Sequence, residues 1–237
     1  MFIIIDGIDG SGKSTILNSW KNWFLKQEFP VFDLREWWEK YKTFPEFDKI
    51  KKAKVIISAE PTQAWLGSAI REEIVRDGRE YGGLSIAQAF ALDREILYRR
   101  LLIPALKAKK IVLQERGVTT TLVYQPIQKK KVALKDILSL PGNQLTLKYR
   151  PDFLVIAKIF PQKAIERLRK RFHKQDGSIF ENLAFEIKAQ KRFLSLWFKR
   201  FFEKRGTYVL YFNTDDTENR VQEEAVRLLK NCLQFKI

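Results

Sequence analysis

Nine residues near the start of the chain have the types and spacing of a phosphate-binding loop. Gly7 and Gly12 are followed directly by Lys13 and Ser14, which gives the pattern G-x-x-x-x-G-K-[ST]. Glycines let backbone N–H groups close around phosphate oxygens, the lysine can reach the β and γ phosphates, and the serine hydroxyl can bind Mg²⁺. The pattern predicts a nucleoside triphosphate site made by Gly7, Ile8, Asp9, Gly10, Ser11, Gly12, Lys13, Ser14 and Thr15.

The flanking residues predict the elements that such a loop needs. Residues 2–6 are an apolar run typical of a buried strand, and Ile16, Leu17, Trp20 and Phe24 follow the loop at helical spacing. A helix that begins at the loop presents its positive N-terminus to phosphate. Because strand, loop and helix occur in the required order, the pattern favours a phosphate site over a glycine-rich turn that binds nothing.

Apolar runs and helical patterns alternate along all 237 residues. This alternation predicts an α/β fold, a three-layer sandwich in which helices flank a parallel sheet of about five strands. We expect a single domain over residues 1–237, since that length suits one core. Two regions, 35–54 and 126–150, show no clear order. The candidate strands are residues 2–6, 31–34, 55–58, 111–114, 153–159 and 208–212, and the candidate helices begin near Ser14, Gly67, Ser85 (an N-cap), Pro161 and Thr217.

Composition narrows the classes of function. The chain has 44 Lys and Arg against 28 Asp and Glu, a formal net charge of +16, which suits nucleotide phosphates, nucleic acid or a membrane surface. A single cysteine, Cys232, and a single histidine, His173, exclude a Cys/His zinc cluster and an internal disulfide. The sequence has no run of roughly 18 apolar residues, which a membrane span needs. We expect a cytoplasmic protein without membrane contact.

Three motifs accompany the predicted strands. Glu60-Pro61-Thr62 follows the strand at 55–58, and Glu115-Arg116 follows the strand at 111–114. Between them, Phe90 and Arg94 are four residues apart, which puts both on one face of a helix. Ligands of parallel α/β sheets bind beyond the carboxyl ends of the strands, so these motifs are candidate ligand contacts.

With the glycine loop, these motifs make the chain resemble the thymidylate kinase family, which phosphorylates thymidine monophosphate (dTMP) with ATP. The order of motifs matches over nearly the whole chain: a loop with an acid inside it, Glu-Pro, Phe-x-x-x-Arg, acid-Arg with a downstream Tyr-Gln, Pro-Asp before a strand, and a basic lid. The resemblance implies a P-loop fold, ATP and Mg²⁺ as cofactors, dTMP as substrate and a homodimer. The apolar helix from Ser85 to Leu106 can supply the dimer face, although burial in the core explains its apolar residues equally well.

The resemblance also assigns residues to the substrate. Asp9 would accept a hydrogen bond from the deoxyribose 3′-hydroxyl, Phe90 would stack on thymine, and Arg94 would donate to its exocyclic oxygen. The alternative for Phe90 is a place in the core. The full set implied to bind substrate is Asp9, Glu60, Phe90, Arg94, Arg116, Thr120, Thr121 and Tyr124.

The acid-Arg motif would act on phosphate and metal. Arg116 would hold the acceptor phosphate through a charge-assisted contact. Glu115 would bind Mg²⁺ through water or orient the arginine. Thr120 and Thr121 would lie near the base, and Tyr124 beside the sugar, where its ring would exclude a 2′-hydroxyl. Ordinary helix packing is the alternative for these last three.

A basic segment at about 163–182 matches the lid of the family. Phosphoryl transfer needs positive charge around the moving group. In the family the catalytic arginine comes from the loop or from the lid, and this loop has Gly10 and Ser11, so the resemblance assigns it to the lid. Spacing does not choose among the lid arginines. The implied catalytic residues are Lys13, Arg116, Arg167, Arg169 and Arg171, and the implied metal ligands are Ser14 and Glu115.

The chain departs from the family pattern in four respects. Roughly twenty residues, 35–54, precede Glu-Pro, and their aromatic content predicts a packed insertion over the acceptor side. Glu115 stands where aspartate is usual, and Lys158 where the family tends to have aspartate. Gly177 follows the lid's Asp176, where an arginine is common. The insertion leaves the choice of nucleobase open.

We therefore expect a nucleoside monophosphate kinase that makes dTDP from dTMP and ATP, for dTTP synthesis. One alternative is a kinase for another nucleotide. An alternative of a different class is a basic P-loop protein that binds nucleic acid. Because no recognition-helix or RNA-stacking motif is present, nucleic acid is not an expected partner.

Overall fold

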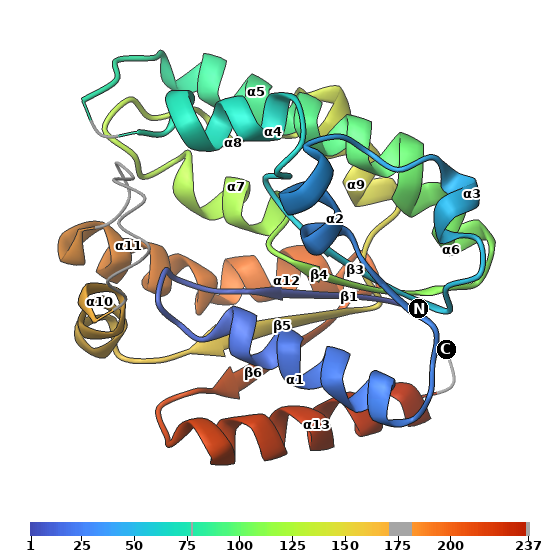
Figure 1. Cartoon of the computed structure of the whole chain (residues 1–237). Helices are drawn as coiled ribbons and strands as arrows, with labels where there is room; N and C mark the ends of the chain where they lie inside the picture. The colour runs from blue at the N-terminus through green and yellow to red at the C-terminus, as the bar shows by residue number, and fades with distance from the viewer. Residues whose placement is uncertain (77, 171–181, 236–237) are drawn as a thin grey trace.

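A six-stranded, wholly parallel sheet forms the centre of the molecule (Figure 1). The structure, a computed structural model, describes residues 1–76, 78–170 and 182–235. The strand order is β2-β3-β4-β1-β5-β6. The strands are β1 (Phe2–Asp6), β2 (Val31–Asp33), β3 (Val55–Ala59), β4 (Ile111–Glu115), β5 (Phe153–Lys158) and β6 (Tyr208–Asn213).

The α/β fold class is confirmed, but the sheet has one strand more than expected. All six candidate runs form strands, including the three-residue β2, which pairs with β3 from Val31 opposite Val55 to Asp33 opposite Ile57. This short strand lies at the edge of the sheet, next to β3 alone. The sheet therefore has six strands, against an expected count of about five.

Helices cover both faces of the sheet (Figure 1). Helices α1 and α13 pack on one face, and α5, α7, α9, α11 and α12 lie on the other. The helices are α1 (Lys13–Lys26), α2 (Leu34–Tyr41), α3 (Phe47–Ile50), α4 (Leu66–Ala69), η1 (Ile70–Ile74), α5 (Gly83–Leu97), η2 (Tyr98–Leu102), α6 (Ile103–Lys107), α7 (Val118–Tyr124), α8 (Leu134–Ser139), α9 (Pro141–Lys148), α10 (Pro161–Arg169), α11 (Leu183–Phe193), α12 (Leu196–Glu203) and α13 (Glu218–Gln234), where η marks a π-helix.

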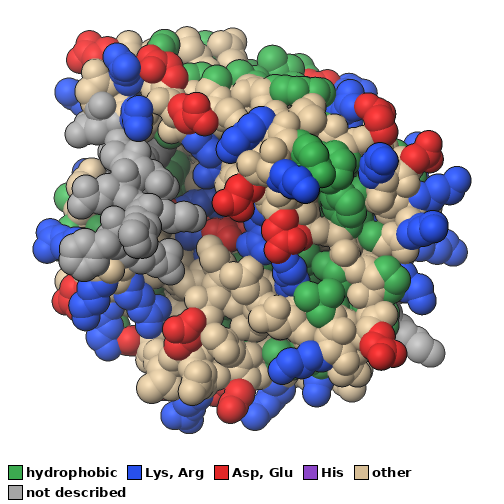
Figure 2. All heavy atoms as spheres, in the orientation of Figure 1, with side chains coloured by type: hydrophobic (Ala, Val, Ile, Leu, Met, Phe, Trp, Pro, Cys, Tyr) green, Lys and Arg blue, Asp and Glu red, His purple; other side chains and the backbone are tan. Residues whose placement is uncertain are grey.

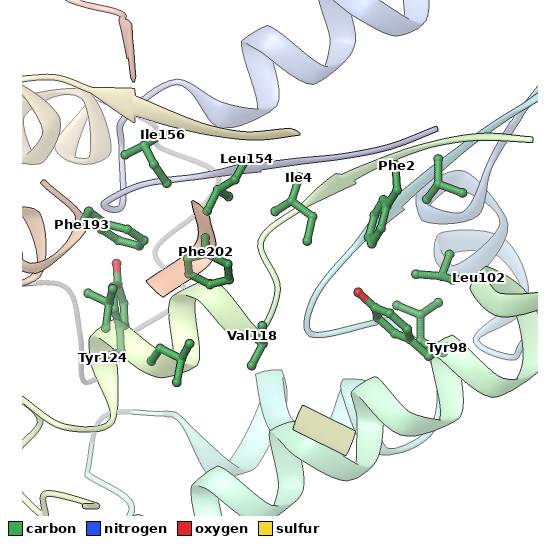
Figure 3. Close-up of a cluster of buried hydrophobic side chains, with 14 of the residues drawn as sticks. Phe2, Ile4, Tyr98, Leu102, Val118, Tyr124, Leu154, Ile156, Phe193 and Phe202 are labelled. Carbon is green, nitrogen blue, oxygen red and sulfur yellow. The ribbon is translucent and has the colours of Figure 1, made fainter. Parts of the chain in front are cut away.

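Strand β1 contributes side chains to two separate hydrophobic cores. Side chains of a strand alternate between its faces, so Phe2 and Ile4 enter the larger core, whereas Ile3 and Ile5 enter the core under α1 and α13. Figure 3 shows part of the larger core, with Phe2 and Ile4 facing helical residues such as Tyr98. The ring centroids of Phe2 and Tyr98 are 6.2 Å apart in an edge-to-face contact. A central strand buried on both faces fixes the loop that follows it.

Two regions without predicted elements contain helices. Helix α2 starts after Asp33, whose carboxylate accepts a hydrogen bond from the Arg35 N–H at 3.0 Å. In the second region, α9 begins at Pro141, a residue favoured at the first position of a helix. Both helices have eight residues, too few for a clear apolar period. Helix α5 also starts earlier than expected, at Gly83, so Ser85 is not its N-cap.

Residues 35–54 pack against the body of the domain. Trp38, Phe44 and Ile50 are buried in the larger core, and Trp38 contacts Phe44 edge to face. Helix α2 contacts β3, the strand that leads into Glu60. Across the described residues, every helix is too short or too polar to cross a membrane.

Candidate active site

The carboxyl ends of three neighbouring strands meet at one cleft. Glu115, the last residue of β4, is in register with Ile5 of β1 on one side and Ala59 of β3 on the other. The loops after these strands therefore start side by side, and the cleft beside them has a volume of about 910 Å³. Of the predicted site residues, it is lined by Asp9, Gly10, Gly12, Lys13, Ser14, Glu60, Glu115 and Arg116.

The glycine loop has the conformation that its sequence predicts. Gly10 has φ 75°, and a Cβ atom there would lie 2.3 Å from the Ala164 carbonyl oxygen, so only glycine fits. Gly12, with φ 85°, is the N-cap of α1. The Lys13 ammonium donates to the carbonyls of Gly7 at 3.2 Å and Ile8 at 2.7 Å. The lysine is thus held within the loop, beside the N-terminus of the helix.

The two predicted metal ligands touch each other. The Ser14 hydroxyl donates to Glu115 Oε2 at 2.9 Å, so the longer side chain of glutamate still reaches the serine. A hydroxyl and a carboxylate are hard oxygen donors, which suit Mg²⁺. In the described ranges no group of three or more His, Cys, Asp or Glu could hold a metal. The pair therefore fits Mg²⁺, which usually keeps several waters and binds phosphate oxygens beside one or two carboxylates.

Arg116 joins the loop through an ion pair with Asp9. Its Nη1 also lies 3.9 Å from Asp6 Oδ1. Burial alone would raise the pKa of Asp9, but the charges of Arg116 and Lys13 outweigh it and hold that pKa below its ordinary value. At Asp6 burial prevails and raises the pKa. Thr120, expected near the base, donates to Asp6 Oδ2 at 2.7 Å.

Glu186 is a site residue that sequence reasoning missed. It lies on α11, is fully buried, and its Oε2 accepts a hydrogen bond from the Asp9 N–H at 3.3 Å. Burial, and then the nearby charge of Asp9, raise the pKa of Glu186 to about 9. No local motif marks this glutamate, because its partner lies 177 positions away.

Arg94 is buried and held from three directions. Its Nε donates to Glu60 Oε2 at 2.7 Å, its Nη2 donates to Thr121 Oγ1 at 3.1 Å, and its Nη1 donates to the Asn143 side chain. Burial raises the pKa of Glu60 to about 7, although Arg94 opposes the shift. Three predicted residues thus meet: Glu60 directly after β3, Arg94 of α5 and Thr121 of α7.

The predicted aromatic contacts differ in burial. Phe90 is half-buried and belongs to neither hydrophobic core of the described residues, whereas Tyr124 is buried. The Tyr124 ring meets Phe185 edge to face, with centroids 4.9 Å apart, and its centroid lies 5.9 Å from the Arg116 guanidinium carbon. Figure 3 shows Tyr124 at the end of the larger core, next to Phe193.

The lid arginines occupy different surroundings. Arg167 of α10 is half-buried and donates to the Thr214 carbonyl at 2.9 Å, and a Cβ atom at Gly12 would lie 3.8 Å from its Nη1. Arg169 is exposed. Arg171 and the rest of the predicted lid up to 181 lie outside the described residues.

A second group of charges missed by sequence reasoning also lines the cleft, namely Lys21, Asp33 and Arg35. Asp33 holds Arg35 through both carboxylate oxygens, at 3.0 and 2.8 Å, and also binds Lys21 at 2.8 Å. Arg71, which also lines the cleft, donates to the Thr62 carbonyl at 3.1 Å. Helix α2 therefore contributes charged side chains to the cleft.

Comparison with known proteins agrees with this arrangement. The family model for thymidylate kinase matches residues 46–224. The chain belongs to the thymidylate kinase family. It is 30% identical over 229 residues to a thymidylate kinase from Caldicellulosiruptor saccharolyticus, with 97% of each chain covered.

Other members of the family are similar over shorter spans. A probable thymidylate kinase from Methanocorpusculum labreanum is 28% identical over 199 residues, 82% of each chain. A thymidylate kinase from Mycoplasma pneumoniae is 30% identical over 171 residues, 72% of this chain and 69% of that one. The resemblance seen in the motifs is thus confirmed over most of the sequence.

Proposed function

We propose that the chain is an ATP-dependent dTMP kinase, which transfers the γ-phosphoryl group of ATP to dTMP to give dTDP. The observation that carries the proposal is the meeting of Lys13, the Ser14–Glu115 pair and Arg116 in one cleft, in a member of the thymidylate kinase family. Together they supply a phosphate loop, a metal site and a cation for an acceptor. A kinase for two phosphorylated substrates needs these parts.

Phosphate binding would replace contacts that the protein makes with itself. Lys13 donates to two loop carbonyls, and Arg116 pairs with Asp9. Phosphate oxygens are stronger acceptors than carbonyls and can take a bidentate contact from a guanidinium. The β and γ phosphates of ATP would engage Lys13, and the acceptor phosphate would engage Arg116. Asp9 would then be free to accept from the 3′-hydroxyl of the sugar.

The remaining residues would align the substrates and balance charge. Ser14 and Glu115 would hold Mg²⁺, which neutralises phosphate charge when it is bound. Phe90 would stack on the thymine ring, Arg94 would donate to its exocyclic oxygen, and Tyr124 would exclude a 2′-hydroxyl. One of the lid arginines, Arg167, Arg169 or Arg171, would supply charge to the transferred group.

The test is a coupled ADP-release assay with ATP, Mg²⁺ and a panel of thymidine, deoxyuridine, uridine, cytidine, adenosine and guanosine monophosphates. Lys13→Ala serves as the blank, with turnover expected to fall at least about 100-fold because charge stabilisation of the phosphates is lost. Turnover with dTMP above all other acceptors supports the proposal. Preference for another monophosphate, or no turnover that depends on an acceptor, would contradict it.

We also propose a homodimer located in the cytoplasm. Leu84 and Leu92 of α5 are 47% and 52% exposed and lie eight positions apart, which puts both on one face of the helix. Two exposed leucines on one helix, with Gln88 between them, support a contact between two copies. Light scattering after size-exclusion chromatography tests it: the wild type should have twice the mass of Leu92→Asp, and equal masses would refute a dimer through α5.

A further inference from the structure

The buried guanidinium of Arg94 has more hydrogen-bond donors than protein acceptors around it in the described part of the chain. Arg94 is 1% exposed, and each of its three nitrogens donates one hydrogen bond: Nε to Glu60, Nη2 to Thr121 and Nη1 to Asn143. A guanidinium has five N–H donors. Within the part of the chain that the structure describes, one N–H on each terminal nitrogen of Arg94 therefore has no protein acceptor.

The unused donors belong to the helix face that carries Phe90. The two residues lie four positions apart on α5, so their side chains are neighbours. Phe90 is half-buried and outside both hydrophobic cores of the described residues, although it is large and apolar. An aromatic face beside unused N–H donors is a surface suited to a flat heterocycle with a carbonyl at its edge.

Asn143 is the one partner of Arg94 that comes from outside the sequence motifs. It lies on α9 and is fully buried. Its Nδ2 donates to the Ile137 carbonyl at 2.7 Å. A carbonyl can only accept, so the amide nitrogen must face Ile137, and the amide oxygen is left for Arg94. The side chain is therefore an oriented acceptor.

Close packing of two helices brings this acceptor to Arg94. A Cβ atom at Gly142 would lie 1.8 Å from the Ala91 carbonyl oxygen of α5, so α9 approaches α5 at a distance that only glycine permits. Arg94 follows Ala91 by three positions, or about one helical turn. The neighbouring residue, Asn143, thereby reaches the guanidinium.

The three partners differ in what they control. Glu60 neutralises the charge of Arg94, and its second oxygen accepts from Gln114 Nε2 at 3.0 Å. A single contact at Nε leaves the guanidinium free to tilt about that contact. Asn143 and Thr121 hold the two terminal nitrogens, and so they fix the plane of the group. Thr121 has a rotating hydroxyl, whereas the amide of Asn143 is locked by Ile137.

We propose that Asn143 is a specificity-determining positioning residue, which aims the unused N–H donors of Arg94 at the exocyclic oxygen of the acceptor base. This inference rests on the proposed function. A donor aimed at that position favours a carbonyl, as in thymine, and disfavours the amino group of cytosine, which would bring two donors together. If the Arg94 donors lose this orientation, the preference for dTMP over dCMP should fall.

The experiment compares Asn143→Leu with Asn143→Asp and with Thr146→Val. Leucine has a similar size but no acceptor, whereas aspartate keeps an acceptor for Arg94 but loses the donor that meets the Ile137 carbonyl. Thr146 is a matched control, since it is fully buried on the same helix and its hydroxyl donates to the Gly142 carbonyl, at 3.1 Å. The measurements are kcat and KM for dTMP and dCMP, KM for ATP, and the thermal melting curve of each variant.

In Asn143→Leu, the dTMP over dCMP ratio of kcat/KM should fall at least about tenfold, mainly through KM for dTMP, with KM for ATP unchanged. Thr146→Val should keep the ratio within about threefold of the wild type. Asn143→Asp, which keeps the acceptor but not its fixed orientation, should give a ratio between those of the wild type and Asn143→Leu. If Asn143→Leu does not fold, Asn143→Ser, too short to reach Arg94, takes its place.

A purely structural role predicts a different result. A folded Asn143→Leu or Asn143→Ser enzyme with the wild-type ratio overturns the inference, as does an equal loss in Thr146→Val. In both cases the proposed function stands, because the wild type still phosphorylates dTMP. If the wild type itself neither binds nor phosphorylates dTMP, the proposed function fails and the inference fails with it.

Discussion

The loop residues form one network of opposite charges around a place for phosphate. Lys13 and Arg116 are the cations, and Asp6, Asp9 and Glu186 surround them. Burial raises the pKa of Asp6 and Glu186, while the cations keep the pKa of Asp9 low. A phosphate group bound at this place would compete with Asp9 for both cations.

Replacement of Arg116 tests which phosphate it binds. Arg116→Ala should raise KM for dTMP by about 10- to 100-fold and KM for ATP much less, because a charge-assisted contact contributes about 1.5–3 kcal/mol. Arg227→Ala, at an exposed position of α13, is the control for loss of one positive charge. Steady-state kinetics with each substrate varied in turn measures both constants. An unchanged KM for dTMP would remove Arg116 from the acceptor site.

Glu186 should make stability depend on pH. Its pKa of about 9 in the folded protein lies above the ordinary 4.5, so the native state holds a proton that the unfolded chain releases, and stability is lost as pH rises from about 4.5 to 9. Glu60 contributes a similar loss only up to about pH 7. Glu186→Gln stays neutral and should be more stable than the wild type at pH 9 by about 1 kcal/mol or more.

Urea unfolding at pH 7, 8 and 9 measures this effect, because Glu60 adds little in that range. Glu223→Gln, at an exposed position of α13, is the matched control and should follow the wild type. Parallel curves for Glu186→Gln and the wild type would mean that Glu186 is ionised in the folded protein.

At the scale of elements, the sequence predicted the loop and the strands. It did not predict which distant helices contact them. The loop from Gly7 to Thr15 and all six strands follow from short-range signals, namely fixed glycine spacing and apolar runs. The eight-residue helices α2 and α9 carry too few turns for a period to stand out. Glu186 contacts the glycine loop and Asn143 contacts α5, each from a helix that is distant in the sequence. The spacing of residues in the sequence does not indicate such contacts.

The contacts of Asp33 hold helix α2 beside the cleft, and they can be tested by substitution. Lys21 pairs with both Asp33 and Glu36, whose side chains are 2% and 70% exposed. Asp33 also caps α2 and holds Arg35, whose hydrogen bond lowers the pKa of Asp33 although burial opposes it. Asp33→Asn should therefore lower the free energy of unfolding at pH 7 by about 1–3 kcal/mol.

Glu36→Gln is the matched control, since it removes an exposed ion pair of the same lysine and should cost less than about 1 kcal/mol. Because a carboxylate with a lowered pKa stabilises the fold only while it is ionised, the difference between the two variants should shrink as pH falls below about 4. Thermal melting of the two variants and the wild type at several pH values measures these losses and their change with pH. Equal losses in the two variants would show that burial of Asp33 adds nothing to its ion pairs.

At the scale of the whole molecule, the positive charge is spread out. Figure 2 shows lysines and arginines scattered over the visible face, without a single continuous basic patch. A net charge of +16 nevertheless produces a long-range field, and both ATP and dTMP are anions. We infer that this field speeds the encounter with substrates and adds little to the chemistry inside the cleft, where contacts are short and shielded from salt.

Salt should therefore slow the association of substrate with the enzyme and leave the turnover rate nearly unchanged. Between about 20 and 300 mM KCl, kcat/KM for dTMP should fall several-fold while kcat changes by less than about twofold, because mobile ions screen charges beyond about 10 Å. Replacement of Lys129, Lys130 and Lys131, three exposed residues between α7 and α8, by glutamate lowers the net charge and should flatten the salt dependence. The matched control replaces the same lysines by arginine and keeps the charge. If both triple variants respond to salt as the wild type does, the dependence arises from contacts within the cleft and the distributed charge serves another purpose.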